Sequence, residues 1–117
     1  MLSFSSNRKY HLYTGPTDMR KQFDGLCGLV SEHFGQPATS GDVFIFINRR
    51  RNRIKLLMWD VTGYALYYKR LERGTFELPA VEDGRHSVEL EWTTLVFLLE
   101  GVELRSIRHR KRYRKTA

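Results

Sequence analysis

Four arginines within five positions are the most chemically distinctive feature of this chain. The cluster consists of Arg49, Arg50, Arg51 and Arg53, with Lys55 following one strand alternation later. A guanidinium group donates paired hydrogen bonds to phosphate oxygens or to the edge of guanine. No acidic residue follows before Asp60, so nothing nearby in the sequence neutralises the charge. The pattern favours contact with nucleic acid over its alternative, a solvated turn.

A second group of candidates combines tyrosines with cations. It consists of Tyr64, Tyr67, Tyr68, Lys69, Arg70 and Arg73. Tyrosines beside cations can stack on bases and hold a nucleic-acid backbone, or they can cover a sheet surface against another element. Strand alternation places Tyr64 and Tyr68 on a core face, with Tyr67 and Lys69 on the other. Only the second face is therefore interpreted as functional.

The net charge of +7 is carried entirely by the last residues of the chain. Residues 1–104 hold 13 basic and 13 acidic residues, whereas residues 105–117 hold 7 basic and no acidic ones. The candidate contacts there are Arg108, Arg110, Lys111 and Arg112. A block of like charge repels itself and binds polyanions by releasing their counterions. This predicts a flexible tail that contacts nucleic acid, with a solubilising end as the alternative.

The length suits one domain over residues 1–104, followed by the basic tail at 105–117. Apolar and β-branched runs predict a hairpin of two strands joined by the arginine loop, and a third consecutive strand after it. The predicted strands are 9–14, 43–48, 53–59, 64–69, 75–78 and 86–90.

Two helices complete the predicted fold. Apolar residues spaced on one helical face predict a long helix over residues 18–34, and a nearly all-apolar run predicts a short one over 92–100. Thr17 is expected to cap the first helix, and Arg20 to pair with Asp24 one turn away. The fold class is thus α+β: an antiparallel β-sheet with one long N-terminal and one short C-terminal helix packed on one face.

The segment TGPTDMRKQFDGL, residues 14–26, resembles the opening signature of a known family. The family is the accessory protein, TnpB or Orf2-like, of IS66-type insertion sequences. Its signature residues here are Gly15, Pro16, Thr17, Asp18, Met19, Arg20, Lys21, Phe23, Asp24 and Gly25. Blocks at residues 41–60 and 63–76 agree, and the resemblance extends from Tyr13 to about Gly101. It implies a role in DNA transposition, with the chemistry supplied by a separate, larger transposase.

Catalysis finds little support in the residues themselves. Strand transfer by a DDE-type enzyme needs three carboxylates around two metal ions, and the acids here form no such cluster. The histidines show no zinc spacing, and no glycine-rich phosphate loop is present. We therefore expect no catalytic residues, no metal and no cofactor.

Composition also suggests where the protein works. No apolar run reaches the roughly 18 residues of a membrane span, and no secretory signal pattern is found, so a cytoplasmic protein without a membrane partner is expected. The single cysteine, Cys27, cannot form an internal disulfide and is expected to be a small buried apolar residue.

Two functional hypotheses follow. In the first, the chain is a non-catalytic accessory protein of transposition that binds DNA, at the ends of the element, through the basic hairpin and tail. In the second, it is a protein-interaction module that docks the transposase without reading DNA itself.

Overall fold

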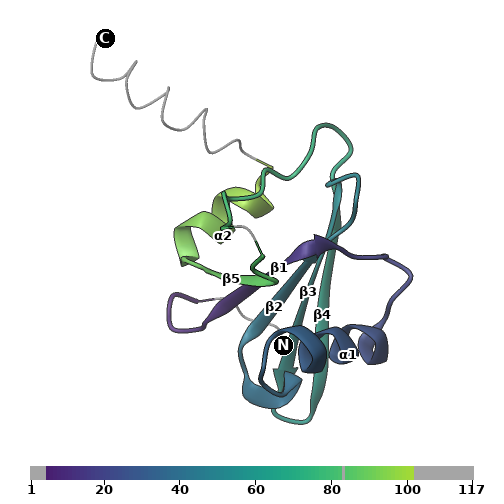
Figure 1. Cartoon of the computed structure of the whole chain (residues 1–117), viewed down its shortest axis with the longest axis vertical. Coiled ribbons are helices and arrows are strands. Elements are labelled where there is room, and N and C mark those ends of the chain that lie inside the picture. The colour runs from purple at the N-terminus through teal and green to yellow at the C-terminus, as the bar shows by residue number, and fades with distance from the viewer. Residues whose placement is uncertain (1–4, 83, 102–117) are drawn as a thin grey trace.

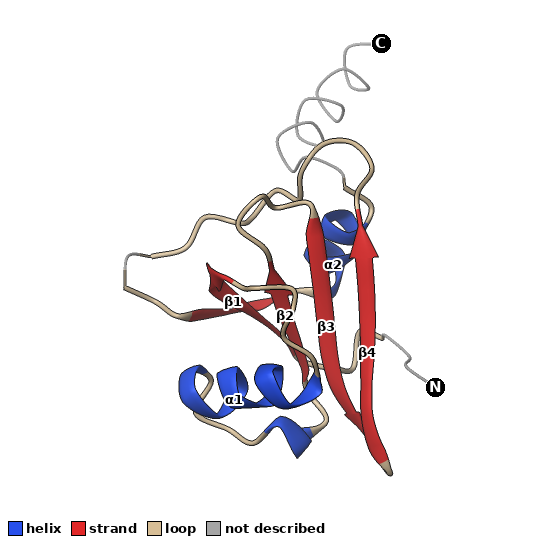
Figure 2. Cartoon of the chain, turned by 90° about the vertical axis from the view of Figure 1, so that its right-hand side faces the viewer, coloured by secondary structure: helices blue, strands red, loops and turns tan. Residues whose placement is uncertain are grey.

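The computed structural model describes residues 5–82 and 84–101, which form a five-stranded mixed sheet between two helices (Figures 1 and 2). The strand order is β4-β3-β2-β1-β5. The elements in chain order are β1 (Tyr10–Pro16), α1 (Phe23–His33), a 3-10 turn (Ala38–Ser40), β2 (Val43–Ile47), β3 (Arg53–Asp60), β4 (Gly63–Arg70), β5 (Ser87–Leu90) and α2 (Trp92–Leu99).

The predicted hairpin and third strand are confirmed, but the prediction of a purely antiparallel sheet is wrong. β3 pairs antiparallel with both β2 and β4, and β1 with β5. β1 and β2, however, run parallel, with Tyr10 opposite Val43. The reason is the connection through α1, a crossover that returns the chain to the same end of the sheet. No strand forms at 75–78, although Phe76 is fully buried there.

The two helices lie on opposite faces of the sheet rather than on one face (Figure 2). On one face, Leu26 and Val30 of α1 pack in a cluster with Leu57 of β3. On the other, Leu95 and Leu98 of α2 belong to a second cluster that also includes Phe76. Since both faces are covered, all five residues of β2 are buried, as expected for a central strand between two layers.

The first helix is shorter than predicted. It has 11 residues and begins at Phe23, with Gln22 at the N-cap position, so Thr17 does not cap it. It ends at His33, within one residue of the predicted end, and Gly35 just beyond it adopts a φ of 65° that other residues disfavour. α2 likewise ends just before Gly101, whose φ is 71°.

Some expectations fall outside this description. The basic tail, with Arg108, Arg110, Lys111 and Arg112, lies beyond the described residues. Within the described part of the chain, none of the helices combines the length and the apolar character needed to cross a membrane.

Because the core has two sides, substitution of either of two neighbouring residues of β3 should destabilise the fold. Leu56 faces α2 and Leu57 faces α1, and both are fully buried. Leu56→Ala and Leu57→Ala should therefore each lower the free energy of unfolding by about 2–5 kcal/mol, measured by urea denaturation. The control Val61→Ala, at an exposed position, should not lower it. A near-neutral result at either leucine would contradict the three-layer arrangement.

Candidate nucleic-acid interface

The arginine loop between β2 and β3 is an ordered turn held by Asn48. The Asn48 Oδ1 atom accepts hydrogen bonds from the backbone N–H groups of Asn52 and Arg53, each at 3.0 Å. Its Nδ2 atom donates to Asn52 Oδ1 at 2.8 Å. Such side-chain hydrogen bonds replace the backbone hydrogen bonds between β2 and β3 where the two strands separate. The backbone of the loop is therefore fixed without help from the arginine side chains.

A second segment braces the same loop from outside the hairpin. The N–H of Phe76 donates to the carbonyl of Arg51 at 2.6 Å, and the N–H of Leu71 donates to the carbonyl of Asn52 at 2.8 Å. Arg51 has a φ of 58°, a left-handed conformation that non-glycine residues adopt only when their surroundings impose it. The burial of the Phe76 ring anchors this brace in the core.

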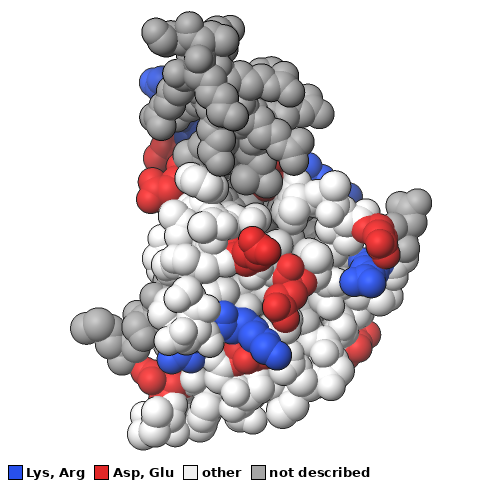
Figure 3. All heavy atoms as spheres, turned by 90° about the vertical axis from the view of Figure 1, so that its left-hand side faces the viewer, with Lys and Arg blue, Asp and Glu red and all other residues white. Residues whose placement is uncertain are grey.

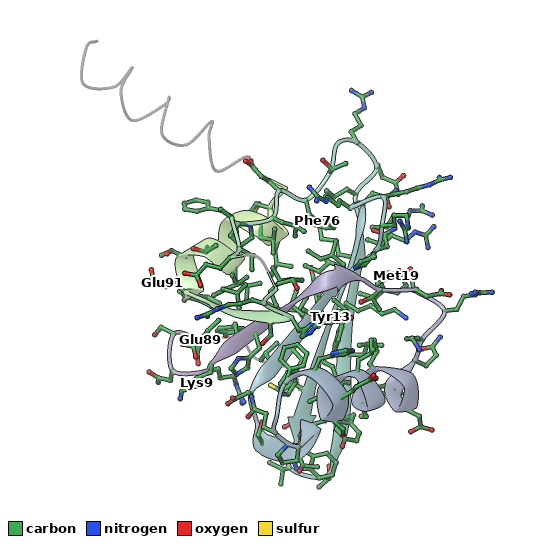
Figure 4. The ribbon with its side chains drawn as sticks, in the orientation of Figure 1. Lys9, Tyr13, Met19, Phe76, Glu89 and Glu91 are labelled. Atoms are coloured by element: carbon green, nitrogen blue, oxygen red, sulfur yellow. The ribbon has the colours of Figure 1, made fainter. Side chains whose placement is uncertain are left out.

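An open groove of about 610 Å³ lies where the hairpin loop faces the signature segment. It is lined by Pro16, Thr17, Asp18, Met19, Arg20, Asn48, Arg49, Arg50, Arg53 and Tyr68. Four arginines and one aspartate thus share one hollow, so its lining is strongly positive. Nitrogen-tipped side chains gather at this end, above Met19, while Lys9, Glu89 and Glu91 lie on the opposite side (Figure 4).

Lys55 is buried, which corrects its sequence-based grouping with the DNA-contacting residues. The side chain lies on the same face as Arg53 but is only 1% exposed. Its Nζ atom donates to the carbonyls of Met19 and Lys21, both at 2.8 Å. The ammonium also lies 4.7 Å from the ring centroid of Tyr68, a cation–π contact. Lys55 therefore holds the signature segment on the sheet and offers nothing to a ligand.

Within the signature segment, Asp18 organises the turn before α1. Its Oδ1 atom accepts from the backbone N–H of Arg20 at 2.9 Å, and its carboxylate pairs with the guanidinium of Arg20 at 2.7 Å. These bonds from Arg20 lower the pKa of Asp18 to about 2. The predicted pairing of Arg20 with Asp24 is therefore replaced by one with Asp18, and Asp24 instead lies in the first turn of α1, near the positive end of the dipole.

The remaining signature residues have structural positions. The backbone N–H of Thr17 donates to the carbonyl of Ile47, while its buried Oγ1 atom has no hydrogen-bond partner among the described residues. Phe23 begins α1 and is partly exposed rather than in the core. A Cβ atom on Gly15 would meet the ring of Tyr13 at 3.0 Å, and one on Gly25 would meet Lys21 at 3.2 Å. The signature thus shapes the wall of the groove opposite the hairpin.

Of the two neighbouring tyrosines, Tyr68 is the one that is exposed beside the arginines of the groove. Tyr68 is 46% exposed and lines the groove, whereas Tyr67 packs against the α2-side core. The predicted core position of Tyr64 is confirmed, because it packs against the α1-side cluster, but the predictions for Tyr68 and Tyr67 are wrong. Both sides of β4 carry aromatic residues, and alternation alone does not say how far along the strand each side is covered. The Tyr68 hydroxyl accepts a hydrogen bond from Arg53 Nη1 at 2.9 Å.

The other predicted basic residues do not line the groove. Lys69 donates to the carbonyl of Leu99 at 2.6 Å, at the C-terminal end of α2. Arg70 pairs with Glu72 at 2.8 Å, and Arg51 lines smaller hollows near Leu78. Arg73 is exposed in the turn after β4. The structure therefore brings together Arg49, Arg50 and Arg53, and adds Arg20, which sequence reasoning had placed in the signature only.

Charge elsewhere is mixed, and no metal site accompanies the groove. The face in Figure 3 shows acidic and basic side chains interspersed over a largely uncharged surface. Across residues 5–82 and 84–101, no three His, Cys, Asp or Glu side chains are grouped so that they could hold a metal ion.

Known proteins are similar to most of this chain. The model of the family described as IS66 Orf2 like protein matches residues 8–109. Two proteins of Sinorhizobium fredii are similar over 90% of this chain: uncharacterized protein y4hO, 33% identical over 90% of its own length, and uncharacterized protein y4jC, 32% identical over 91%. No solved structure matches.

The clamp formed by Lys55 can be tested by substitution. Lys55→Met keeps the length of the side chain but leaves the carbonyls of Met19 and Lys21 without their donor. We expect a loss of about 2 kcal/mol in the free energy of unfolding and faster hydrogen exchange in residues 17–22. Lys69→Met is the matched control, since it removes an ammonium bonded to the carbonyl of Leu99 near the opposite face. Unchanged exchange in residues 17–22 of Lys55→Met would contradict the clamp.

The pairing of Asp18 with Arg20 predicts a specific titration. Because the pKa of Asp18 is lowered from 3.8 to about 2 in the folded chain, the pair stabilises the fold above about pH 4. This contribution is lost as the pH falls toward 2. In Arg20→Ala, the midpoint of the Asp18 carboxyl signal in an NMR titration should rise toward 3.8. Arg85→Ala, which removes a distant cation, should leave it in place. Equal midpoints in all three proteins would rule out the pairing in solution.

Proposed function

Since this chain belongs to the family of IS66 Orf2 like proteins, we propose that its transposition-associated accessory role is to bind DNA at the ends of the element, without catalysis. The arginine groove is the binding surface in this proposal, and the cytoplasm is the place where it acts. The transposase encoded by the same element would be the partner that carries out strand transfer.

The observation that carries this proposal is the convergence of four arginines on one open groove. Among the described residues, no acidic side chain pairs with Arg49, Arg50 or Arg53, and the one acid in the lining is already bonded to Arg20. Unneutralised guanidinium groups at a surface hollow are suited to phosphate oxygens, which they bind bidentately. The ordered backbone of the hairpin loop further reduces the entropy lost on binding.

Docking of the transposase is the second candidate function. It is favoured first by an exposed apolar side chain away from the groove, because Phe97 of α2 is 37% exposed. β4 is also an edge strand in the strand order, and edge strands can pair with a strand of another protein. Phe97 lies outside the groove lining, so substitutions there and in the groove can test the two functions on the same protein.

DNA binding can be measured by fluorescence anisotropy with a duplex from the terminal repeat of the element and with a scrambled duplex. We expect affinity to fall steeply with salt, because phosphate binding releases counterions. Arg49→Ala/Arg50→Ala should weaken binding by about tenfold and reduce the salt slope by about 2, while the fold remains intact.

The control Lys9→Ala/Arg85→Ala removes the same charge from residues outside the groove lining and should change the affinity much less. A truncated chain without residues 105–117 separates the groove from the basic tail. If all binding is lost with the tail and the groove substitutions have no effect, the proposal that the groove binds DNA fails. Co-purification with transposase after nuclease treatment would then favour the docking function.

A further inference from the structure

Resting on the proposed function, we infer that the groove takes an unpaired DNA strand, with one base stacked on Tyr68 and the flanking phosphates bound by the arginines. The inference concerns the class of DNA, single-stranded rather than duplex.

The Tyr68 ring is fixed in place before any ligand arrives. The ammonium of Lys55 lies 4.7 Å from its ring centroid, so one face of the ring is occupied by a buried cation. The hydroxyl is held by Arg53 at 2.9 Å. Tyr68 as a residue is nevertheless 46% exposed. A ring that is immobilised at one face and at its tip offers its remaining surface for stacking with little further loss of entropy.

Tyr68 and Arg53 form a ridge between two hollows. Both residues line the groove of about 610 Å³, and both also line a neighbouring hollow of about 320 Å³ that includes Arg70 and Glu72. The cations without an acidic partner among the described residues are Arg49 and Arg50 in the groove and Arg53 on the ridge, whereas Arg70 beyond the ridge is paired with Glu72 at 2.8 Å. This is the arrangement by which single-strand binders follow a backbone while bases stack on aromatic side chains.

Duplex DNA would use only part of this surface. Its bases are stacked on one another and present edges, not faces, in the grooves. A duplex could therefore contact the arginines through its phosphates but could not stack on Tyr68. An unpaired strand can do both, because every base has a free face. The ring should consequently contribute to the binding of single strands and little to the binding of duplex.

The test compares the full-length protein and its variants on one labelled oligonucleotide, presented either as a single strand or as its duplex. Tyr68→Leu should weaken single-strand binding by about tenfold and duplex binding by no more than about twofold. Tyr68→Phe, which retains the ring but not the hydroxyl, should keep most of the single-strand affinity. Phe97→Leu is the matched control, because it removes a comparably exposed ring from α2 and should change neither affinity.

A further variant gives a readout that does not depend on loss of affinity. In Tyr68→Trp, stacking should quench indole fluorescence when the single strand is added, beyond any quenching of Trp59 and Trp92 in the parent protein, and the duplex should quench it much less. The thermal midpoint of each variant is measured alongside, so that loss of the fold is recognised.

The outcomes separate the inference from the function on which it rests. If Tyr68→Leu weakens both forms of DNA equally, or if Tyr68→Phe loses as much as Tyr68→Leu, stacking on Tyr68 is overturned. Arginine-dependent duplex binding would in that case still support the proposed function. If the full-length protein binds neither form of DNA, both proposals fail together.

Discussion

The contacts of one buried ammonium group determine how the rest of this surface is built. Lys55 places a positive charge inside the protein and satisfies it with the carbonyls of Met19 and Lys21 and with the ring of Tyr68. A buried charge is costly unless such partners surround it, so the signature segment and β4 must both stay close to β3. The same two carbonyls lie in the stretch that was expected to be helical, which accounts for a helix that begins only at Phe23.

In the groove, the groups that fix the backbone are different from the groups that carry the charge. The backbone of the hairpin loop is fixed by Asn48 and by the segment that ends in the buried ring of Phe76. The guanidinium groups of Arg49 and Arg50 take no part in that network, and both residues are exposed. Because stability resides in neutral side chains and backbone bonds, the charge remains available for a polyanion. This division is typical of a binding surface on a rigid support.

Several features followed from local pattern, and others did not. The hairpin, the third strand and, to within one residue, the end of α1 were predicted, because strand alternation and helical spacing depend on neighbouring residues. Tyr64 was correctly placed against the core, but the exposed tyrosine of β4 was assigned wrongly, since Tyr67 and Tyr68 have the same side chain and only tertiary packing on the α2 side covers part of Tyr67. The parallel pairing of β1 with β2 was missed, because strand direction depends on where a helical crossover returns the chain.

The sequence by itself determined the α+β class, the arginine cluster, the family signature and the uneven distribution of charge, because each depends only on residue types and their local spacing. Tertiary structure alone decided which cations reach solvent. Arg53 and Lys55 are two residues apart on one face of a strand, yet Arg53 lines the groove and Lys55 is sealed beneath residues 17–22. A lysine can bind a ligand only if no other part of the chain covers it. Local sequence patterns do not predict such a contact between distant segments.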